Sequence, residues 1–346
     1  MKKNFIGNTN LSLTNLGIGT APIGGWPKAL GEDQALEILE TAWQNGVRYF
    51  DTAPFYGFGM AEERLGKFLK NKKKNEYVIS TKVGRLIVDS IKKTSDESFF
   101  KGAPNREPYF DFSYDATMRS FEESLQRLQI DKIDILLIHD PDNHYNEALN
   151  GALKAILKLK DQKVISAVGC GMNQNEMLTN FADTGLVDCF LLAGRFTLLD
   201  QRSLDNLIPA CENNNVSLII GGVYNSGILA NPSASSYFDY AQLNDSWYEK
   251  AKILGVRQPE SYESNTYWLN KANKIKKICD DHQVTLKAAA INFPYLNKNI
   301  ATVLTGVSST EEVYENINNY NTKISDDLWK KLLNEDLIQE KAISFL

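Results

Sequence analysis

The segment VRYFDTAPFYG at residues 47–57 places a carboxylate and a phenol at the end of a short apolar stretch. Asp51 ends this stretch, and Tyr56 follows five residues later between aromatic and glycine neighbours. A phenol has a pKa of about 10 in water. It exchanges protons at neutral pH where a cation or a hydrogen-bond donor stabilises its anion. The segment therefore predicts a tyrosine acid/base that needs a cation from elsewhere in the chain.

Two later apolar stretches also end on polar side chains. Lys82 ends residues 77–82, and His139 ends residues 133–139. If these stretches are parallel strands of one barrel, their C-terminal ends open on the same face, where barrel enzymes build their active sites. Lys82 is then the required cation, and Asp51 holds it in place. His139 is expected to hydrogen-bond the substrate oxygen or the phenol.

Each of these residues has a simpler interpretation when it is taken alone. A single Asp51 would cap a turn, Lys82 would be solvated, and His139 would be a partly buried core histidine. A tyrosine beside glycine is usually a packed turn residue. An Asp, a Lys and a His at the ends of three successive strands would arise together by chance far more rarely than any one of them alone, so the joint pattern favours catalysis.

Eight short apolar stretches alternate with segments of helical periodicity. Most of them lack polar alternation, which is typical of parallel strands covered on both faces. The alternation predicts an α/β fold, a (β/α)8 TIM barrel with long βα loops, as a single domain over residues 1–346, although the length alone also allows two domains. The predicted strands are Leu16–Thr20, Val47–Asp51, Tyr77–Lys82, Ile133–His139, Ile165–Gly169, Cys189–Ala193, Val216–Gly221 and Thr302–Gly306.

Helical segments are predicted between these strands, at Glu32–Asn45, Asp115–Leu128, Glu147–Leu159, Gln174–Phe181 and Leu204–Asn213. A doubly wound sheet is the rival fold. However, Gly17-x-Gly19 is followed by Thr20-Ala21-Pro22 rather than by the rest of a G-x-G-x-x-G motif. Two connections, residues 83–113 and 224–264, are long and aromatic, which indicates functional lids or short helical insertions.

Composition excludes several classes of protein. The hydrophobic fraction of 43% is ordinary for a globular protein, and the net charge of −5 argues against nucleic-acid binding. No secretory h-region or membrane-length apolar run is visible. The four cysteines form no CxxC pair and are expected to be buried free thiols of a cytoplasmic protein. With three histidines and no zinc-type spacing, no metal site is expected.

At the level of motifs, the chain resembles the aldo-keto reductase superfamily from about residue 5 to about residue 320. The matching motifs are GIGT, FDTAPFYG, AEERLGKFL, STKVGR, RSFEESLQRL, DILLIHDPD, AVGCGMN and GGVYNSGILA. HDPD and YNSGILA make it most similar to the aldose 1-dehydrogenase branch, with its L-fucose, D-threo-aldose and L-galactose dehydrogenases and the related pyridoxal 4-dehydrogenases.

The resemblance implies a barrel that binds a nicotinamide cofactor across its C-terminal face, and a tetrad of Asp51, Tyr56, Lys82 and His139. Tyr56 is then the proton donor for reduction and the base for oxidation. Lys82, paired with Asp51, is expected to lower the pKa of Tyr56. His139 is expected to orient the substrate oxygen.

The resemblance also implies cofactor contacts. Asn173 is expected to bind the nicotinamide carboxamide, and residues 222–227 to wrap the pyrophosphate. The alternatives are that Asn173 caps a helix beginning at Gln174 and that the glycines only form a tight turn. The full predicted set is Thr20, Asn173, Gly222, Val223, Tyr224, Asn225, Ser226, Gly227, Gly306, Ser308, Glu312, Glu315 and Asn316.

The segment after the eighth predicted strand bears on the choice between NAD and NADP. Residues 306–316 contain no Lys or Arg to pair with a 2′-phosphate, and they contain Glu311, Glu312 and Glu315. Carboxylates there would repel the 2′-phosphate and could accept hydrogen bonds from ribose hydroxyls. The prediction is therefore NAD in preference to NADP. In the alternative, Ser309 and Glu312 form a capping box without a role in cofactor choice.

The reaction expected is oxidation of the C1 hydroxyl of a sugar lactol to a lactone. The residues expected to select the sugar are Trp26, Phe55, Asp140 and Arg195. Pyridoxal oxidation and NADPH-dependent aldehyde reduction are the competing reactions, and a redox-sensing nicotinamide-binding subunit is the non-enzyme alternative. The expected partner is a small-molecule sugar, and both a monomer and a dimer remain open.

Overall fold

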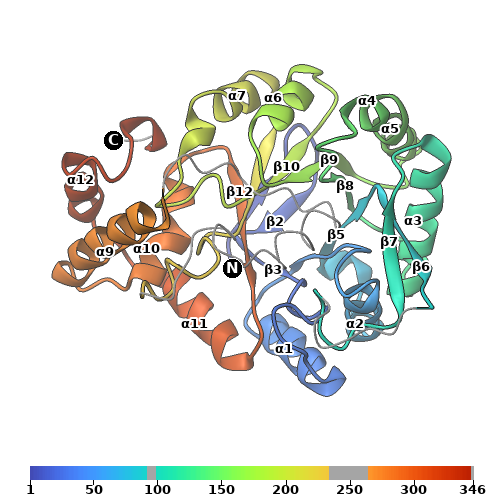
Figure 1. Ribbon diagram of the computed structural model, residues 1–346, viewed down its shortest axis with the longest axis horizontal. Coiled ribbons are helices and arrows are strands. Elements are labelled where there is room, and N and C mark those ends of the chain that lie inside the picture. The colour runs from blue at the N-terminus through green and yellow to red at the C-terminus, as the bar shows by residue number, and fades with distance from the viewer. Residues whose placement is uncertain (92–98, 234–263, 344–346) are drawn as a thin grey trace.

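Eight parallel strands close into a barrel in the computed structural model, which describes residues 1–91, 99–233 and 264–343. Their order around the barrel is β10-β11-β12-β3-β4-β5-β8-β9 (Figure 1). The strands are β3 (Leu16–Gly19), β4 (Tyr49–Asp51), β5 (Val78–Val83), β8 (Ile135–His139), β9 (Ala167–Met172), β10 (Cys189–Ala193), β11 (Ser217–Gly221) and β12 (Ile300–Gly306).

This arrangement confirms the predicted (β/α)8 fold and all eight predicted strands. The boundaries differ by up to three residues; the largest difference is at β9, predicted at 165–169 and observed at Ala167–Met172. Its sequence AVGCGM is glycine-rich at the predicted end. The pairing of β9 with β10 nevertheless continues through Gly169. Because glycine has no side chain, the Cys189 carbonyl of β10 can come close to Gly169, where a side chain would collide with it.

Helices surround the barrel in Figure 1. They are α1 (Glu32–Gln44), α2 (Met60–Leu69), α3 (Tyr114–Leu128), α4 (Tyr145–Glu147), α5 (Leu153–Asp161), α6 (Glu176–Asp183), α7 (Leu207–Asn214), α9 (Asn265–Asp281), α10 (Leu286–Asn292), α11 (Thr310–Asn321) and α12 (Asp326–Asn334). Two predicted helices are modified. A π-helical turn at Ala148–Ala152 joins α4 to α5, and a 3-10 turn at Arg202–Leu204 precedes α7, which begins three residues later than predicted.

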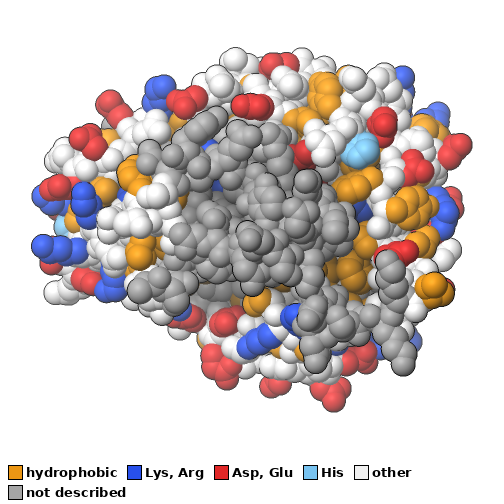
Figure 2. All heavy atoms as spheres, viewed as in Figure 1, with side chains coloured by type: hydrophobic (Ala, Val, Ile, Leu, Met, Phe, Trp, Pro, Cys, Tyr) orange, Lys and Arg blue, Asp and Glu red, His pale blue; other side chains and the backbone are white. Residues whose placement is uncertain are grey.

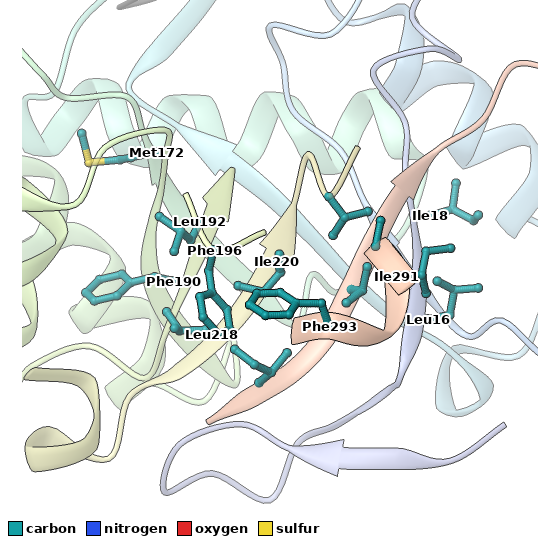
Figure 3. Packing of buried hydrophobic residues seen from close by; sticks show 14 of the residues in the cluster. Leu16, Ile18, Met172, Phe190, Leu192, Phe196, Leu218, Ile220, Ile291 and Phe293 are labelled. Atoms are coloured by element: carbon teal, nitrogen blue, oxygen red, sulfur yellow. The ribbon is translucent and has the colours of Figure 1, made fainter. Parts of the chain in front are cut away.

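The apolar faces of the strands and helices meet in one large buried cluster. Figure 3 shows part of it, where Phe190 and Ile220 on the strands lie near Phe196 and Phe293. A second cluster fills the barrel interior and includes Tyr49, Ile135 and Leu137. Since bulky apolar side chains fill the barrel, it is a packed core and the strand ends become its functional surface.

A buried carboxylate attaches α2 to the barrel next to these strand ends. Glu62 is fully buried and accepts hydrogen bonds from Thr81 Oγ1 on β5 and from Arg127 Nε on α3, both at 2.6 Å. From the same helix, Arg64 donates to the carbonyls of Ile23 and Leu30. These contacts fix the first βα loop, which contains Trp26, against the barrel.

In the connection at residues 83–113, the described residues form a β-hairpin, and residues 92–98 lie outside the described part. Strand β6 (Arg85–Asp89) pairs antiparallel with β7 (Arg106–Phe110). The turn from β5 into β6 depends on Gly84, whose φ of +100° favours glycine and whose missing side chain makes room for Phe112. In the second long connection, residues 234–263 lie outside the described residues, so the prediction of a lid there stays a prediction.

Other predictions concern the chain as a whole. All four cysteines are buried free thiols, as predicted. None of the helices in the described ranges is long and apolar enough to cross a membrane. Acidic and basic side chains are interspersed around the rim of the face shown in Figure 2.

Candidate active site

The ends of β4, β5 and β8 bring the predicted acid, lysine and histidine to one place. Neighbouring strands pair in this order, with Asp51 opposite Ser80 and Lys82 opposite Leu137. The Lys82 ammonium lies 2.7 Å from Asp51 Oδ2 and donates to the Thr52 carbonyl at 2.8 Å. It also hydrogen-bonds the Tyr56 phenol, and its Nζ lies 4.7 Å from the centre of the Tyr56 ring.

A hydrogen-bond chain inside the barrel orients the Asp51 carboxylate. Ser80 Oγ donates to Asp51 Oδ1 at 2.7 Å and lies 2.8 Å from the Tyr49 hydroxyl. Asp51 thus has one oxygen on Ser80 and the other on Lys82, and both partners are buried. Because one carboxylate oxygen accepts from Ser80 and the other pairs with Lys82, Asp51 is placed to hold Lys82 in position.

Burial and the neighbouring charges together set the pKa values of Asp51 and Lys82. Burial raises the pKa of Asp51, and Lys82 and Ser80 oppose that rise. Burial alone would lower the pKa of Lys82, but Asp51 and Tyr56 together raise it above its usual value. Lys82 is therefore a cation at neutral pH.

Lys82 lowers the pKa of Tyr56 as predicted, but the net pKa of the phenol is raised. Burial raises it, and the nearby Asp51 charge adds to the rise. Lys82 lowers it by charge and by hydrogen bonding, as expected, but does not outweigh burial. The net pKa lies above that of a free phenol, because the low-dielectric site disfavours the phenolate. Tyr56 is thus protonated at neutral pH, which is the form that donates a proton.

His139 lies beside Tyr56 in its neutral form. The two ring centres are 5.9 Å apart and the ring planes are nearly perpendicular, at 89°. Burial lowers the pKa of His139 well below its usual range, and the charges of Arg85 and Lys82 lower it further. A neutral imidazole keeps one N–H donor and one acceptor, so it can orient a substrate oxygen without carrying a charge.

Arg85 is a buried charged residue to which the sequence analysis gave no role. Its side chain is 1% exposed, and Nη2 lies 2.5 Å from Asp140 Oδ2. The same carboxylate oxygen lies 3.5 Å from His139 Nε2. Burial raises the pKa of Asp140 to about 6, although Arg85 opposes the rise. The available signal was the STKVGR motif, in which a charged residue follows Lys82 after only Val83 and Gly84.

Aromatic side chains form a wall next to the tetrad. Phe55 packs on the His139 ring with 6.1 Å between ring centres, and it contacts Phe99 and Phe100. Trp26 stacks on Phe99 with 6.1 Å between ring centres and 11° between the planes. The structure therefore brings two predicted substrate residues, Trp26 and Phe55, into one aromatic cluster at the strand ends.

Comparison with known proteins identifies the family of this barrel. The model of the Aldo/keto reductase family matches residues 15–334. The chain belongs to that family. It is therefore an oxidoreductase of a family that uses nicotinamide cofactors and acts on small molecules, which confirms the resemblance drawn from the motifs.

Individual members of the family match over nearly the whole chain. The chain is 36% identical to a pyridoxal 4-dehydrogenase of Microbacterium luteolum, over 97% of this chain and 98% of the relative. It is 34% identical to a D-threo-aldose 1-dehydrogenase of a Pseudomonas species, over 95% of each. Among solved structures, a glycerol dehydrogenase of Gluconobacter oxydans superposes with a TM-score of 0.72 at 22% identity, covering 97% of this chain and 94% of that one, which shows the shared fold.

The residues predicted to hold the nicotinamide cofactor of this family have features that fit it. Thr20 Oγ1 is buried without a hydrogen-bond partner among the described residues. The turn after β11 has positive φ at Gly222, Asn225, Ser226 and Gly227, and space lies open where a side chain would stand at Gly227. Such a turn leaves backbone N–H groups for an anion. Asn173 follows β9, and because α6 begins at Glu176 with Asn175 as its cap, the alternative that Asn173 caps this helix is wrong.

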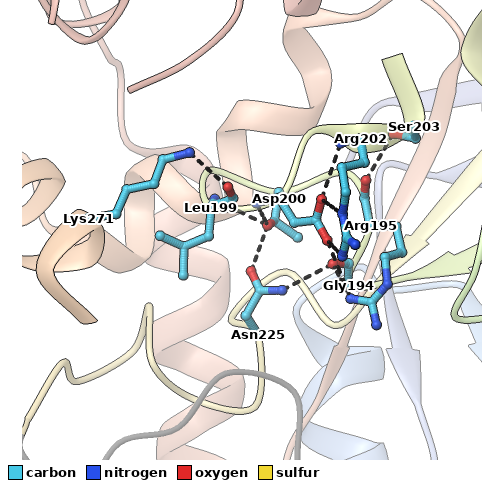
Figure 4. A network of polar contacts seen from close by, with 9 residues as sticks. Gly194, Arg195, Leu199, Asp200, Arg202, Ser203, Asn225 and Lys271 are labelled. Atoms are coloured by element: carbon cyan, nitrogen blue, oxygen red, sulfur yellow. Dashed lines mark hydrogen bonds and ion pairs between the residues drawn. The ribbon is translucent and has the colours of Figure 1, made fainter. Parts of the chain in front are cut away.

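Two of the predicted contact residues, Asn225 and Arg195, are instead engaged in the scaffold (Figure 4). Asn225 is fully buried; its Nδ2 donates to the Gly194 carbonyl at 3.1 Å and its Oδ1 accepts from Thr197 Oγ1 at 2.6 Å. Arg195 is buried, donates to the same carbonyl at 2.8 Å, and lies 3.6 Å from Asp200. This network joins the loop after β10 to the turn at 222–227.

The segment after β12 confirms the capping box. Glu312 accepts from the Ser308 N–H at 2.7 Å, and its own N–H donates to Ser309 Oγ at 3.3 Å. Glu315 holds Lys287 of α10 at 2.8 Å. Tyr224 donates to Asn316 Oδ1 at 2.8 Å, which links the two segments that the sequence predicted to contact the cofactor. The remaining predicted contacts, Val223, Gly306 and Ser308, lie in these segments.

Proposed function

We propose that this protein oxidises a cyclic hemiacetal to a lactone, with an aldose oxidised at C1 as the preferred substrate. The observation that carries the proposal is the relay from Asp51 through Lys82 to the Tyr56 phenol beside the neutral imidazole of His139. One acid/base at a reacting hydroxyl is the requirement of hydride-transfer chemistry on an alcohol. The nearby Asp140 carboxylate supplies an acceptor for a further hydroxyl of a polyol.

A nicotinamide held by Asn173 and the turn at 222–227 would supply the hydride acceptor for C1, and the protein residues handle the proton. In its phenolate form Tyr56 takes the proton of the C1 hydroxyl as the C–H bond breaks, so that the carbinol becomes the lactone carbonyl. Because burial raises the pKa of Tyr56, this form is the minor one at neutral pH, and the protonated phenol serves the reverse reduction. Lys82 stabilises the phenolate that a deprotonated Tyr56 presents, and Asp51 keeps Lys82 charged and in place. His139 donates to or accepts from the reacting oxygen and thereby fixes its direction.

The second candidate is oxidation of pyridoxal, which also closes to a cyclic hemiacetal through its neighbouring hydroxymethyl group. The 36% identity to a pyridoxal 4-dehydrogenase favours it. The stacked pair of Trp26 and Phe99 would suit a flat aromatic ring. NADPH-dependent aldehyde reduction and a redox-sensing subunit remain weaker alternatives, since neither draws on the hydroxyl-accepting carboxylate of Asp140.

We also propose NAD as the preferred cofactor. Its support is the lack of Lys and Arg at residues 306–316 and the Glu312 carboxylate at the start of α11. Two contacts reduce the repulsion that these carboxylates would exert on a 2′-phosphate. Glu312 is held by the capping box, and Glu315 is neutralised by Lys287. A tenfold preference for NADP in kcat/KM would overturn this part of the proposal.

The test is a screen of aldoses and pyridoxal with NAD and NADP, followed by the absorbance of the reduced cofactor. The wild-type protein should oxidise at least one hemiacetal, and Tyr56→Phe should lose about a hundredfold or more of kcat. Cofactor binding to Tyr56→Phe, measured by quenching of tryptophan fluorescence, should persist. Retained turnover in Tyr56→Phe would show that the phenol is not the acid/base.

A further inference from the structure

Arg85 is among the largest fully buried side chains of the described residues, and it contacts Phe55 and Asp140, two of the predicted substrate residues. Gly84 turns the chain so that β6 begins with Arg85 three residues after Lys82. Burying a guanidinium is unfavourable unless other groups compensate its lost hydration. The side chains that contact the Arg85 guanidinium therefore indicate which residue it positions.

Among the described residues, Arg85 contacts two aromatic faces and one carboxylate. Arg85 Cζ lies 4.3 Å from the centre of the Phe55 ring and 5.0 Å from that of Phe110 on β7. Such contacts between a guanidinium and ring faces fix the plane of the guanidinium. Its Nη2 then meets Asp140 Oδ2 at 2.5 Å. The hairpin of β6 and β7 thus aims Arg85 at one side chain of the loop after β8.

Asp140 is held in a backbone conformation that a non-glycine residue seldom adopts. Its φ is +44°, and its N–H donates to the Gly171 carbonyl of β9 at 3.1 Å. Non-glycine residues in this region need support from their surroundings. In this conformation the Asp140 carboxylate lies beside His139, and 18% of the Asp140 side chain is exposed.

We propose that Arg85 is a positioning residue that holds the Asp140 carboxylate beside His139, where Asp140 accepts a hydrogen bond from a substrate hydroxyl next to the reacting carbon. The inference rests on the proposed function and deepens it, because it assigns the preference for a polyhydroxylated substrate to this pair. Arg85 itself needs no contact with the substrate. The fixed guanidinium leaves the second carboxylate oxygen of Asp140 available to the hydroxyl.

The experiment compares Arg85→Met and Arg85→Lys with a matched control, Arg106→Met, which removes an arginine from the same hairpin but from a half-exposed ion pair with Glu63. Two substrates are used: the best aldose of the screen, and benzaldehyde in the reduction direction, which has no neighbouring hydroxyl. Arg85→Met should raise KM for the aldose about ten- to a hundredfold while kcat falls less. KM for benzaldehyde and for the cofactor should change less than threefold.

Arg85→Lys should recover part of the aldose KM, because the ammonium restores the charge but not the planar contact with Phe55 and Phe110. Arg106→Met should behave as the wild type. Asp140→Asn provides the second test if Arg85→Met fails to fold, and it should raise aldose KM in the same selective way.

Two failures are distinguishable. A wild-type protein that reduces benzaldehyde but oxidises no aldose would overturn the proposed function, and the hydroxyl assignment with it. A wild-type protein that oxidises an aldose, together with Arg85 and Asp140 variants whose KM values for the aldose stay unchanged or rise equally for benzaldehyde, would overturn the positioning role alone.

Discussion

Lys82 and Asp51 form a fully buried ion pair, with 2.7 Å between Nζ and Oδ2 and both side chains nearly inaccessible to solvent. Ser80 contacts the pair from the barrel core, and Tyr56 lies on the side of Lys82. A buried pair of this kind contributes little net stability, but removing one partner leaves an uncompensated charge. Its value to the protein is therefore the fixed cation next to the phenol.

Lys82→Met should separate stability from catalysis. The variant leaves Asp51 unpaired, and we expect the free energy of unfolding to fall by about 3–5 kcal/mol. We also expect kcat to fall about a hundredfold or more, because Lys82 is the cation that lowers the pKa of Tyr56 by charge and hydrogen bonding. Urea unfolding and steady-state kinetics measure the two effects. The double variant Lys82→Met with Asp51→Asn should regain stability but not activity; recovery of both would contradict the assigned role of Lys82.

The pKa of Asp140, about 6, predicts a pH dependence of substrate affinity. Above this value the carboxylate is charged and accepts the substrate hydroxyl, and below it the neutral acid loses its ion pair with Arg85. KM for the aldose should therefore rise as pH falls through about 6. The groups that influence this titration are Arg85 on β6, Lys82 on β5 and Asp142 on the same loop.

The source of that inflection can be assigned with two variants. The pKa of His139 lies well below its usual range, so the imidazole is neutral on both sides of pH 6 and adds no inflection there. Asp140→Asn should abolish the pH dependence of KM. His139→Gln should lower kcat but keep the inflection, and loss of the inflection in His139→Gln would assign it to the histidine instead.

The ion pair of Lys287 and Glu315 predicts a change in cofactor preference. Glu315→Gln releases Lys287, which can then approach a 2′-phosphate, so the ratio of kcat/KM for NADP to that for NAD should increase about three- to tenfold. The effect should shrink at high salt because both side chains are partly exposed. Glu335→Gln, which breaks the Lys331 pair on α12, is the matched control and should leave the ratio unchanged.

Asn225 should affect cofactor binding through the scaffold. Asn225→Ala removes one of the two side-chain donors to the Gly194 carbonyl and the acceptor of the Thr197 hydroxyl, and it releases the turn at 222–227. We expect a loss of about 1–3 kcal/mol in the free energy of unfolding and weaker binding of the cofactor. Isothermal titration with NAD measures the second effect. Asn214→Ala removes a side-chain contact to the backbone at the end of α7 and should leave cofactor binding intact.

The sequence by itself determined the barrel and the positions of the tetrad. Parallel strands buried on both faces need nearly unbroken apolar runs, so Asp51, Lys82 and His139 stood out as polar ends of such runs. Neighbouring strands of a barrel end on the same face, which made their convergence a geometric consequence. The family motifs around Tyr56 and the turn at 222–227 added the cofactor.

Only the tertiary structure decided how the other polar side chains are used. Arg85 and Asp140 are 55 positions apart, and their contact depends on the β6–β7 hairpin, whose register no local pattern specifies. The inward turn of Asn225, the capture of Glu312 by its own helix cap, and the approach of Lys287 to Glu315 likewise depend on packing. The pKa of Tyr56 was decided in the same way, because the net result of burial against the Lys82 charge requires the surroundings of the phenol in three dimensions.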